Sequence, residues 1–359
     1  MNGKRRQVVV FIDWDETITS HDTLSLIAPP DDKHEGVPFA EYGKAYVEDL
    51  KQHEKAWQYQ ESASRTGDEI SIPRKGCNLG KGWEEQWAYQ GSLDTVELAS
   101  QKRIEEGGLF RNADPKELER RAIDKVQCRK GWSGNPYPRR IRTGDWGSWL
   151  LDRPLSTPLG HQEQGKPDWQ YHIISVGWSA RFITAALKKV NNNQFMPTSI
   201  CANEIEIDQC TGLGTGKLTK SYDAQKLAER SFRPGEGGIR TGQHKVREMR
   251  RILETCTSDP DPITIYVGDS TTDLGSLLEA HIGLIIGQST SLYNTINKAG
   301  LEKFKIACSD GKIRDVVATQ IAENHQPCLI KVNDWEDVGE VMEIISELIT
   351  KSHKRSLQE

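Results

Sequence analysis

The chain has 359 residues, which is enough for an enzyme core and one substantial second module. Its 47 basic and 52 acidic residues are spread along the sequence and give a net charge of −5, so neither a nucleic-acid nor a membrane partner is indicated. The seven cysteines include no CxxC pair, which argues against a disulfide framework or a structural zinc site and favours a reducing, cytoplasmic setting. We therefore expect a small-molecule partner.

Short apolar runs separated by helical patterns dominate most of the chain. Strands are predicted at residues 8–12, 172–176, 263–267 and 282–286, with weaker candidates at 199–202 and 328–332. Helices are predicted at residues 180–190, 245–255, 274–280 and 336–349. This alternation is typical of an α/β fold with a Rossmann-like, doubly wound parallel sheet. No stretch approaches the roughly twenty apolar residues of a membrane span.

Residues 22–165 interrupt this alternation and predict an inserted, mainly helical cap domain. Helical patterns occur at 39–57, 93–106 and 116–127, with Ser92 and Asp114 as predicted N-caps and Gly107 as a predicted stop. The stretch from 130 to 168 is rich in Gly, Pro and Arg and predicts an irregular segment held by tryptophans. The predicted catalytic core is therefore discontinuous and comprises residues 1–21 and 166–359.

Two carboxylates follow the first predicted strand directly, in the sequence Asp13-Trp14-Asp15-Glu16-Thr17. In an open α/β sheet, ligands bind at the carboxyl ends of the strands. Carboxylates one residue apart can both face such a site, which suits a nucleophile paired with a general acid/base. The alternative is an ordinary acidic loop, so the interpretation depends on further motifs.

The segment Phe11 to Thr17 resembles motif one of the haloacid dehalogenase superfamily, and three later motifs agree with that family. Ser175 ends the second core strand, and Lys245 lies at a helix start. Asp269 and Asp273 form an acidic pair after a later strand. Each position alone is more often structural, but four motifs in this order, each beside the expected element, favour the family.

The resemblance implies a role for each of these residues. Asp13 would be the nucleophile and Asp15 the general acid/base. The implied phosphate-binding residues are Thr17, Ser175, Gly177 and Lys245. Mg²⁺ would be held by the side chains of Asp13 and Asp269 and by the backbone carbonyl of Asp15, because this ion prefers oxygen ligands. Asp273 and Asp22 would support the site.

The position of the insert resembles the phosphoserine-phosphatase-like branch with a helical cap. That branch has a Glu nine positions after the nucleophile and Gly-Gly after the serine that ends the second core strand, which is Ser175 here, whereas this chain has Asp22 and Val176-Gly177. Residues 17–23 are also similar to phosphatases acting on vitamin phosphates such as thiamine monophosphate. A vitamin phosphate, a prenyl or terpenyl phosphate and phosphoserine therefore all stay open as substrates.

We predict a Mg²⁺-dependent phosphatase that hydrolyses a small-molecule phosphomonoester through an aspartyl phosphate on Asp13. One alternative is a phosphotransferase that uses an acceptor other than water, and another is a catalytically silent protein that keeps the fold for regulation or binding. Gly212 to Lys217 does not have the spacing of a P-loop and predicts a turn between strands. Trp14 and Trp178 are predicted to pack rather than to stack on substrate, whereas Trp83 and Trp87 are predicted to influence substrate preference.

Overall fold

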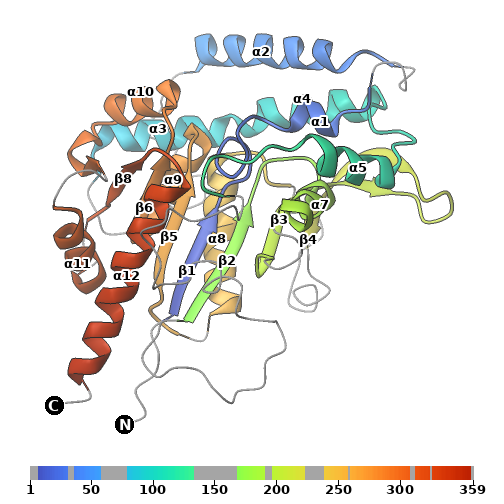
Figure 1. Cartoon of the computed structure of the whole chain (residues 1–359). Coiled ribbons are helices and arrows are strands. Elements are labelled where there is room, and N and C mark those ends of the chain that lie inside the picture. Colours follow the sequence, from blue (N-terminus) through green and yellow to red (C-terminus); the bar gives the residue numbers. More distant parts are fainter. Residues whose placement is uncertain are drawn as a thin grey trace.

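The computed structural model describes residues 7–30, 36–57, 79–132, 168–190, 196–222, 238–257, 259–307, 312–323 and 326–356. The centre of the molecule is an eight-stranded sheet with the strand order β4-β3-β2-β1-β5-β6-β8-β7 (Figure 1). The strands are β1 (Gln7–Ile12), β2 (Asp168–Ile174), β3 (Ser199–Ile207), β4 (Gly214–Tyr222), β5 (Ile263–Gly268), β6 (Ile282–Ile286), β7 (Lys305–Ala307) and β8 (Leu329–Val332). All the described strand pairs are parallel except β3 with β4. The predicted α/β fold with a Rossmann-like sheet is confirmed.

Strand β1 lies in the middle of the sheet, between β2 and β5. All six of its residues are buried, as its β-branched sequence predicts for a strand covered on both faces. Ile12 pairs with Ile173 of β2 and with Val267 of β5, so these three strands end at nearly the same height. The polar residues that follow them are thereby brought to one edge of the sheet.

Helices cover both faces of the sheet and also lie above its carboxyl edge (Figure 1). They are α1 (Leu24–Ile27), α2 (Phe39–Ala56), α3 (Lys81–Ser92), α4 (Asp94–Glu106), α5 (Pro115–Lys125), α7 (Ala180–Val190), α8 (Gly242–Cys256), α9 (Leu274–Glu279), α10 (Thr290–Lys298), α11 (Ile313–Glu323) and α12 (Trp335–Ser356). Short 3-10 turns occur at Thr271–Asp273 and Glu302–Phe304. Among the described helices, none is both long enough and apolar enough to cross a membrane.

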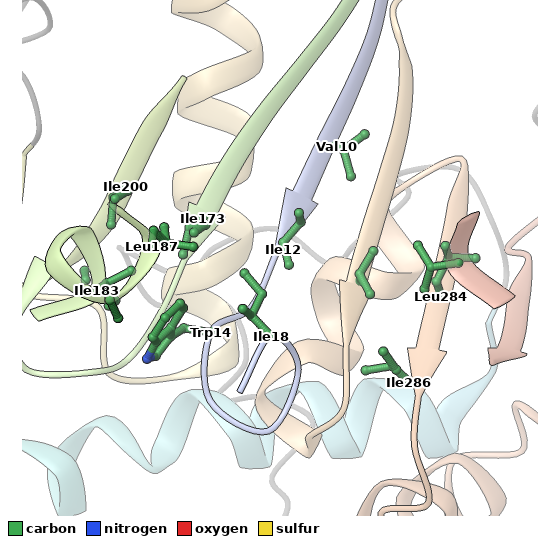
Figure 2. Packing of buried hydrophobic residues seen from close by; sticks show 14 of the residues in the cluster. Val10, Ile12, Trp14, Ile18, Ile173, Ile183, Leu187, Ile200, Leu284 and Ile286 are labelled. Carbon is green, nitrogen blue, oxygen red and sulfur yellow. The ribbon is translucent and has the colours of Figure 1, made fainter. Parts of the chain in front are cut away.

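Two apolar clusters hold these helices to the sheet. Val10 and Ile12 point to one face, where they join a cluster that includes Ile183 and Leu187 of α7 (Figure 2). Val9 and Phe11, the alternate residues of β1, join the cluster on the other face with residues of α8 and α9. Burial on both faces of β1 fixes its register, and therefore the position of the residues that follow it.

The insert between β1 and β2 packs directly on the core. Trp83 and Trp87 of α3 are 0% and 4% exposed and belong to the same apolar cluster as α8 and α9. On the other face, Leu118 and Ala122 of α5 join the cluster that contains α7. Both tryptophans pack against the core, and the effect of Trp83 and Trp87 on substrate preference stays a prediction. The domain boundary itself stays a prediction.

Local signals placed most helix ends well. Asp114 accepts a hydrogen bond from the Lys116 amide and starts α5, and Gly107 ends α4, as predicted. Ser92 was predicted to start the second helix of the insert, but this is wrong, because it is the last residue of α3 and its hydroxyl donates to the Tyr89 carbonyl. Most of the predicted irregular segment, residues 133–167, lies outside the described residues.

Candidate active site

Asp13 follows the last residue of β1 and is 5% exposed. Its amide donates to the Val267 carbonyl at 3.0 Å, which continues the pairing of β1 with β5 by one residue. One carboxylate oxygen, Oδ1, lies 2.8 Å from the Nζ of Lys245. The carboxylate is thus held at the carboxyl edge of the sheet by the backbone on one side and by a cation on the other.

Lys245 is fully buried and bridges two carboxylates. Its Nζ lies 2.8 Å from Oδ1 of Asp13 and 2.8 Å from Oδ1 of Asp273. Burial alone would lower the pKa of this lysine, but the two negative charges outweigh burial and raise it, so Lys245 is held as a cation. The lysine lies in the first turn of α8, whose N-terminus is capped by Thr241 together with His244.

Asp273 is held by hydrogen bonds from neighbouring side chains. The Tyr266 hydroxyl donates to its Oδ1 at 2.7 Å, and the Ser270 hydroxyl donates to its Oδ2 at 2.7 Å. Although burial opposes ionisation, Lys245 and these hydrogen bonds outweigh it and lower the pKa of Asp273. Asp273 is therefore a fixed negative charge that orients Lys245.

A third carboxylate makes the site strongly acidic. Carboxylate oxygens of Asp13, Asp269 and Asp273 all lie within 4.8 Å of one another. Burial, followed by the charge of Asp273, raises the pKa of Asp13 well above its usual range and that of Asp269 to about 7. Three buried carboxylates with one buried lysine leave an excess of negative charge that a cation would relieve. The donors are all oxygens, which suits a hard divalent cation such as Mg²⁺.

Thr17, whose predicted role in phosphate binding stays a prediction, contacts this acidic cluster. Its hydroxyl is buried and donates to Oδ1 of Asp269 at 2.8 Å. This contact joins the loop after β1 to the loop after β5. In the described structure Thr17 therefore orients a carboxylate of the acidic cluster.

Asp15 lies in the same loop after β1 and is half-buried. Its Oδ1 accepts from the Thr23 amide at 2.7 Å and from the Thr23 hydroxyl at 2.6 Å. The Thr23 hydroxyl in turn accepts from the Trp14 indole at 3.1 Å, which directs its proton toward Asp15. Burial raises the pKa of Asp15 to about 6, although the Thr23 hydroxyl acts against burial. A carboxyl group with this pKa can both give and take a proton near neutral pH.

Ser175 and Gly177 lie in the loop after β2, which comes close to Asp15. Ser175 is fully buried, and its Oγ accepts from the Gly177 amide at 2.9 Å. A Cβ added to Gly177 would lie 3.0 Å from Ser175 Oγ and 3.6 Å from Oδ2 of Asp15. The absence of a side chain at Gly177 therefore keeps space open between the predicted phosphate-binding serine and the predicted general acid/base.

The remaining predicted site residues lie at the margin. Asp22 is exposed, and its Oδ1 accepts from the Leu24 amide at the start of α1. Its charge is one of the causes that raise the pKa of Asp15. Trp14 is buried beside the loop, on the side of Ile183 and Leu187 (Figure 2), as its predicted packing role requires. Trp178 is half-buried and meets the rings of Phe39 and Phe110 edge to face.

Other residues hold the loop after β1 in place and were not found from the sequence. The Trp335 indole of α12 donates to the Thr17 carbonyl at 2.9 Å, and Arg129 donates to the Glu16 carbonyl at 3.0 Å. Glu16 has a φ of 54°, a left-handed conformation that is uncommon for a residue with a side chain. Contacts of this kind join positions more than a hundred residues apart, and single-sequence patterns carry no signal for them.

The chain is similar to known proteins at low sequence identity. No family model matches the chain. A CTO1 family protein of Schizosaccharomyces pombe is 24% identical over 295 residues, which are 81% of this chain and 86% of that protein. A substrate-bound phosphoserine phosphatase has a TM-score of 0.40 and 14% identity, covering 81% of this chain and 91% of its own. A phospho-aspartyl intermediate analogue of phosphoserine phosphatase has a TM-score of 0.39 and 14% identity, covering 82% of this chain and 91% of its own.

Proposed function

We propose that the chain is a phosphatase of the haloacid dehalogenase superfamily and hydrolyses a small-molecule phosphomonoester through a covalent intermediate on Asp13. The observation that carries this proposal is the separation of two kinds of carboxylate at the end of β1. Asp13 lies in a buried cluster with Lys245 and two further aspartates, whereas Asp15 lies outside that cluster on Thr23. This arrangement supports one carboxylate as nucleophile and the other as proton donor and acceptor.

In the first half of the proposed reaction, a carboxylate oxygen of Asp13 attacks phosphorus and the bond to the ester oxygen breaks. Protonated Asp15 gives its proton to the leaving alkoxide, so the alcohol departs neutral. In the second half, ionised Asp15 takes a proton from a water molecule that attacks the aspartyl phosphate. Orthophosphate leaves and the carboxylate of Asp13 is restored.

The phosphoryl group carries negative charge on its three outer oxygens, and the site offers donors for them. We assign this role to the Ser175 hydroxyl, the Gly177 backbone and the Lys245 ammonium group. A Mg²⁺ ion held by Asp13, Asp269 and the Asp15 carbonyl would supply the remaining charge neutralisation. Asp273 fixes Lys245, and Thr17 orients Asp269.

The proposal is tested by phosphate release from a panel of phosphorylated metabolites in the presence of Mg²⁺. The panel should include vitamin phosphates, prenyl phosphates and phosphoserine. Asp13→Asn should abolish release, while Asp124→Asn, an exposed aspartate on α5, should leave it unchanged. Release by Asp13→Asn at the wild-type rate would contradict the proposed nucleophile.

Two alternatives differ from hydrolysis in what the same assay would show. A phosphotransferase would consume the ester while releasing less orthophosphate than alcohol, because the phosphoryl group passes to another acceptor. A catalytically silent binding protein would release neither product. The assembly of Asp13, Asp15, Lys245 and Asp269 around one site favours turnover over the silent alternative.

A further inference from the structure

Asn203 lies in β3, outside the predicted site, and is 7% exposed, with its side chain between two loops. One loop follows β2 and contains Val176 and Gly177. The other precedes α8 and contains Ile239. Asn203 is therefore placed where the support of Ser175 meets the support of Lys245.

The carboxamide of Asn203 binds both loops at once. Its Nδ2 donates to the carbonyls of Ile239 at 2.9 Å, Val176 at 3.0 Å and Gly177 at 3.2 Å. Its Oδ1 accepts from the Ile239 amide at 2.9 Å. Since the amide of Ile239 can only donate and its carbonyl can only accept, these two contacts fix which end of the carboxamide is nitrogen.

This combination of donors and acceptor is specific to a short carboxamide. An aspartate would turn an oxygen toward the three carbonyls. An apolar residue would remove the side-chain partner of the Val176 carbonyl and of both Ile239 groups, while the Gly177 carbonyl would keep the backbone amide of residue 203. The neighbouring Gly238 makes room for the group, because a Cβ there would lie 2.1 Å from Oδ1 of Asn203. The carboxamide of Asn203 therefore satisfies buried backbone groups of both loops.

The two loops carry groups that must meet the same phosphoryl group. Ser175 and Gly177 belong to the first loop, and the second continues through Thr241 into the turn of α8 that carries Lys245. A displacement of about 1 Å between groups that bind one transition state can cost about 10²-fold in rate. Turnover should therefore depend on the distance between these two loops.

We propose that Asn203 is a positioning residue that sets the distance between the two phosphate-binding loops. It acts through Gly177 and Ile239 and does not touch the substrate. The proposal rests on the function proposed above, since it assigns Asn203 to the same site. It predicts that loss of the carboxamide weakens recognition of the phosphoryl group common to all substrates.

The first test compares Asn203→Ala with Ser199→Ala. Ser199 is a buried residue of the same strand whose hydroxyl contacts His172, so this control removes a hydrogen bond from β3 away from the two loops. Asn203→Ala should lower kcat/KM by about 10²-fold. The loss should be equal for alkyl and aryl phosphates, and the inhibition constant of orthophosphate should rise. The control should change neither quantity by more than about 3-fold.

The second test perturbs the carboxamide without replacing it. Gly238→Ala places a methyl group against Oδ1 of Asn203, whereas Gly339→Ala on α12 meets nothing within 4 Å. Gly238→Ala should also lower kcat/KM and raise the inhibition constant of orthophosphate, whereas Gly339→Ala should change neither. If Asn203→Ala does not fold, Gly238→Ala still tests whether the carboxamide positions the two loops.

The proposal is overturned if the foldable variants at positions 203 and 238 keep the kcat/KM and orthophosphate inhibition of their controls. It is also overturned if both variants unfold while both controls fold, because Asn203 would then serve the stability of the core. A wild-type protein that releases no phosphate from any ester would contradict the function proposed above. Binding of orthophosphate, measured by calorimetry, would still compare Asn203→Ala with Ser199→Ala in that case.

Discussion

The hydrogen bond from the Thr23 hydroxyl to Asp15 should tune the pH dependence of turnover. At 2.6 Å it is a short contact to a carboxylate whose pKa burial raises to about 6. Asp15 must be protonated to assist an alkoxide leaving group, so turnover of alkyl phosphates should fall as the pH rises through this pKa. A donor to the carboxylate stabilises its charged form, so removal of that donor should raise the pKa further.

The change is Thr23→Val, which removes the hydroxyl and keeps the backbone amide that donates at 2.7 Å. A hydrogen bond to a charged group contributes about 1.5–3 kcal/mol. Since one pKa unit corresponds to about 1.4 kcal/mol, the pKa of Asp15 should rise by about one to two units. The descending limb of the kcat profile should therefore move to about pH 7 to 8.

The assay is phosphate release from an alkyl ester between pH 5 and pH 9, repeated with an aryl phosphate, whose leaving group needs little protonation. Thr23→Ser keeps a hydroxyl and should retain the wild-type limb. The aryl phosphate should show a smaller shift than the alkyl ester. An unchanged limb in Thr23→Val, or an equal shift in Thr23→Ser, would refute the reasoning that Thr23 acts on Asp15 through its hydroxyl.

Three further predictions follow from the site and the core. Asp15→Asn should lower turnover of alkyl phosphates by about 10²- to 10⁴-fold and that of aryl phosphates by less, and an equal loss for both would make Asp15 structural. Activity should vanish with EDTA and return with Mg²⁺, whereas full activity in chelator or recovery with Zn²⁺ alone would contradict an oxygen-only site at Asp13 and Asp269. Burial, followed by the charge of Arg251, lowers the pKa of His172 to about 3, so native His172 stays neutral while the unfolded chain takes up a proton below about pH 6.5. The free energy of unfolding should therefore fall by about 2 kcal/mol between pH 7 and pH 5 through this residue alone. Urea unfolding should show that His172→Gln removes this difference, and an identical pH dependence in the variant would contradict it.

Sequence reasoning placed the residues of the motifs because strand ends are local features. The runs before Asp13 and Asp269 are continuous and apolar, and a parallel sheet brings their carboxyl ends together. Helix α3 was missed for an equally local reason. It starts after Gly80, which has no side chain to cap it, and it contains Gly82 and Gly91, which have low helix propensity. The predicted turn, residues 212–217, overlaps the start of β4 (Gly214–Tyr222), because glycines obscure the alternation of this strand.

The contacts that tune the site could not be predicted in the same way. Thr23, Tyr266 and Asn203 carry common polar groups, and their roles depend on partners from other parts of the fold. For the same reason the sequence does not predict the hydrogen bond from Thr17 to Asp269, which is 252 positions away. Sequence patterns identify which groups are present at strand ends, whereas the folded packing decides which group donates to which.

The central claim, a covalent intermediate on Asp13, is tested most directly by quenching the enzyme with acid during turnover. Peptide mass spectrometry should then find one phosphoryl group on the peptide that contains Asp13. Asp15→Asn should accumulate more of it with an aryl phosphate, because that substrate still forms the intermediate while activation of water is lost. Rapid phosphate release without any phosphoryl group on Asp13, in either the wild type or Asp15→Asn, would contradict the account.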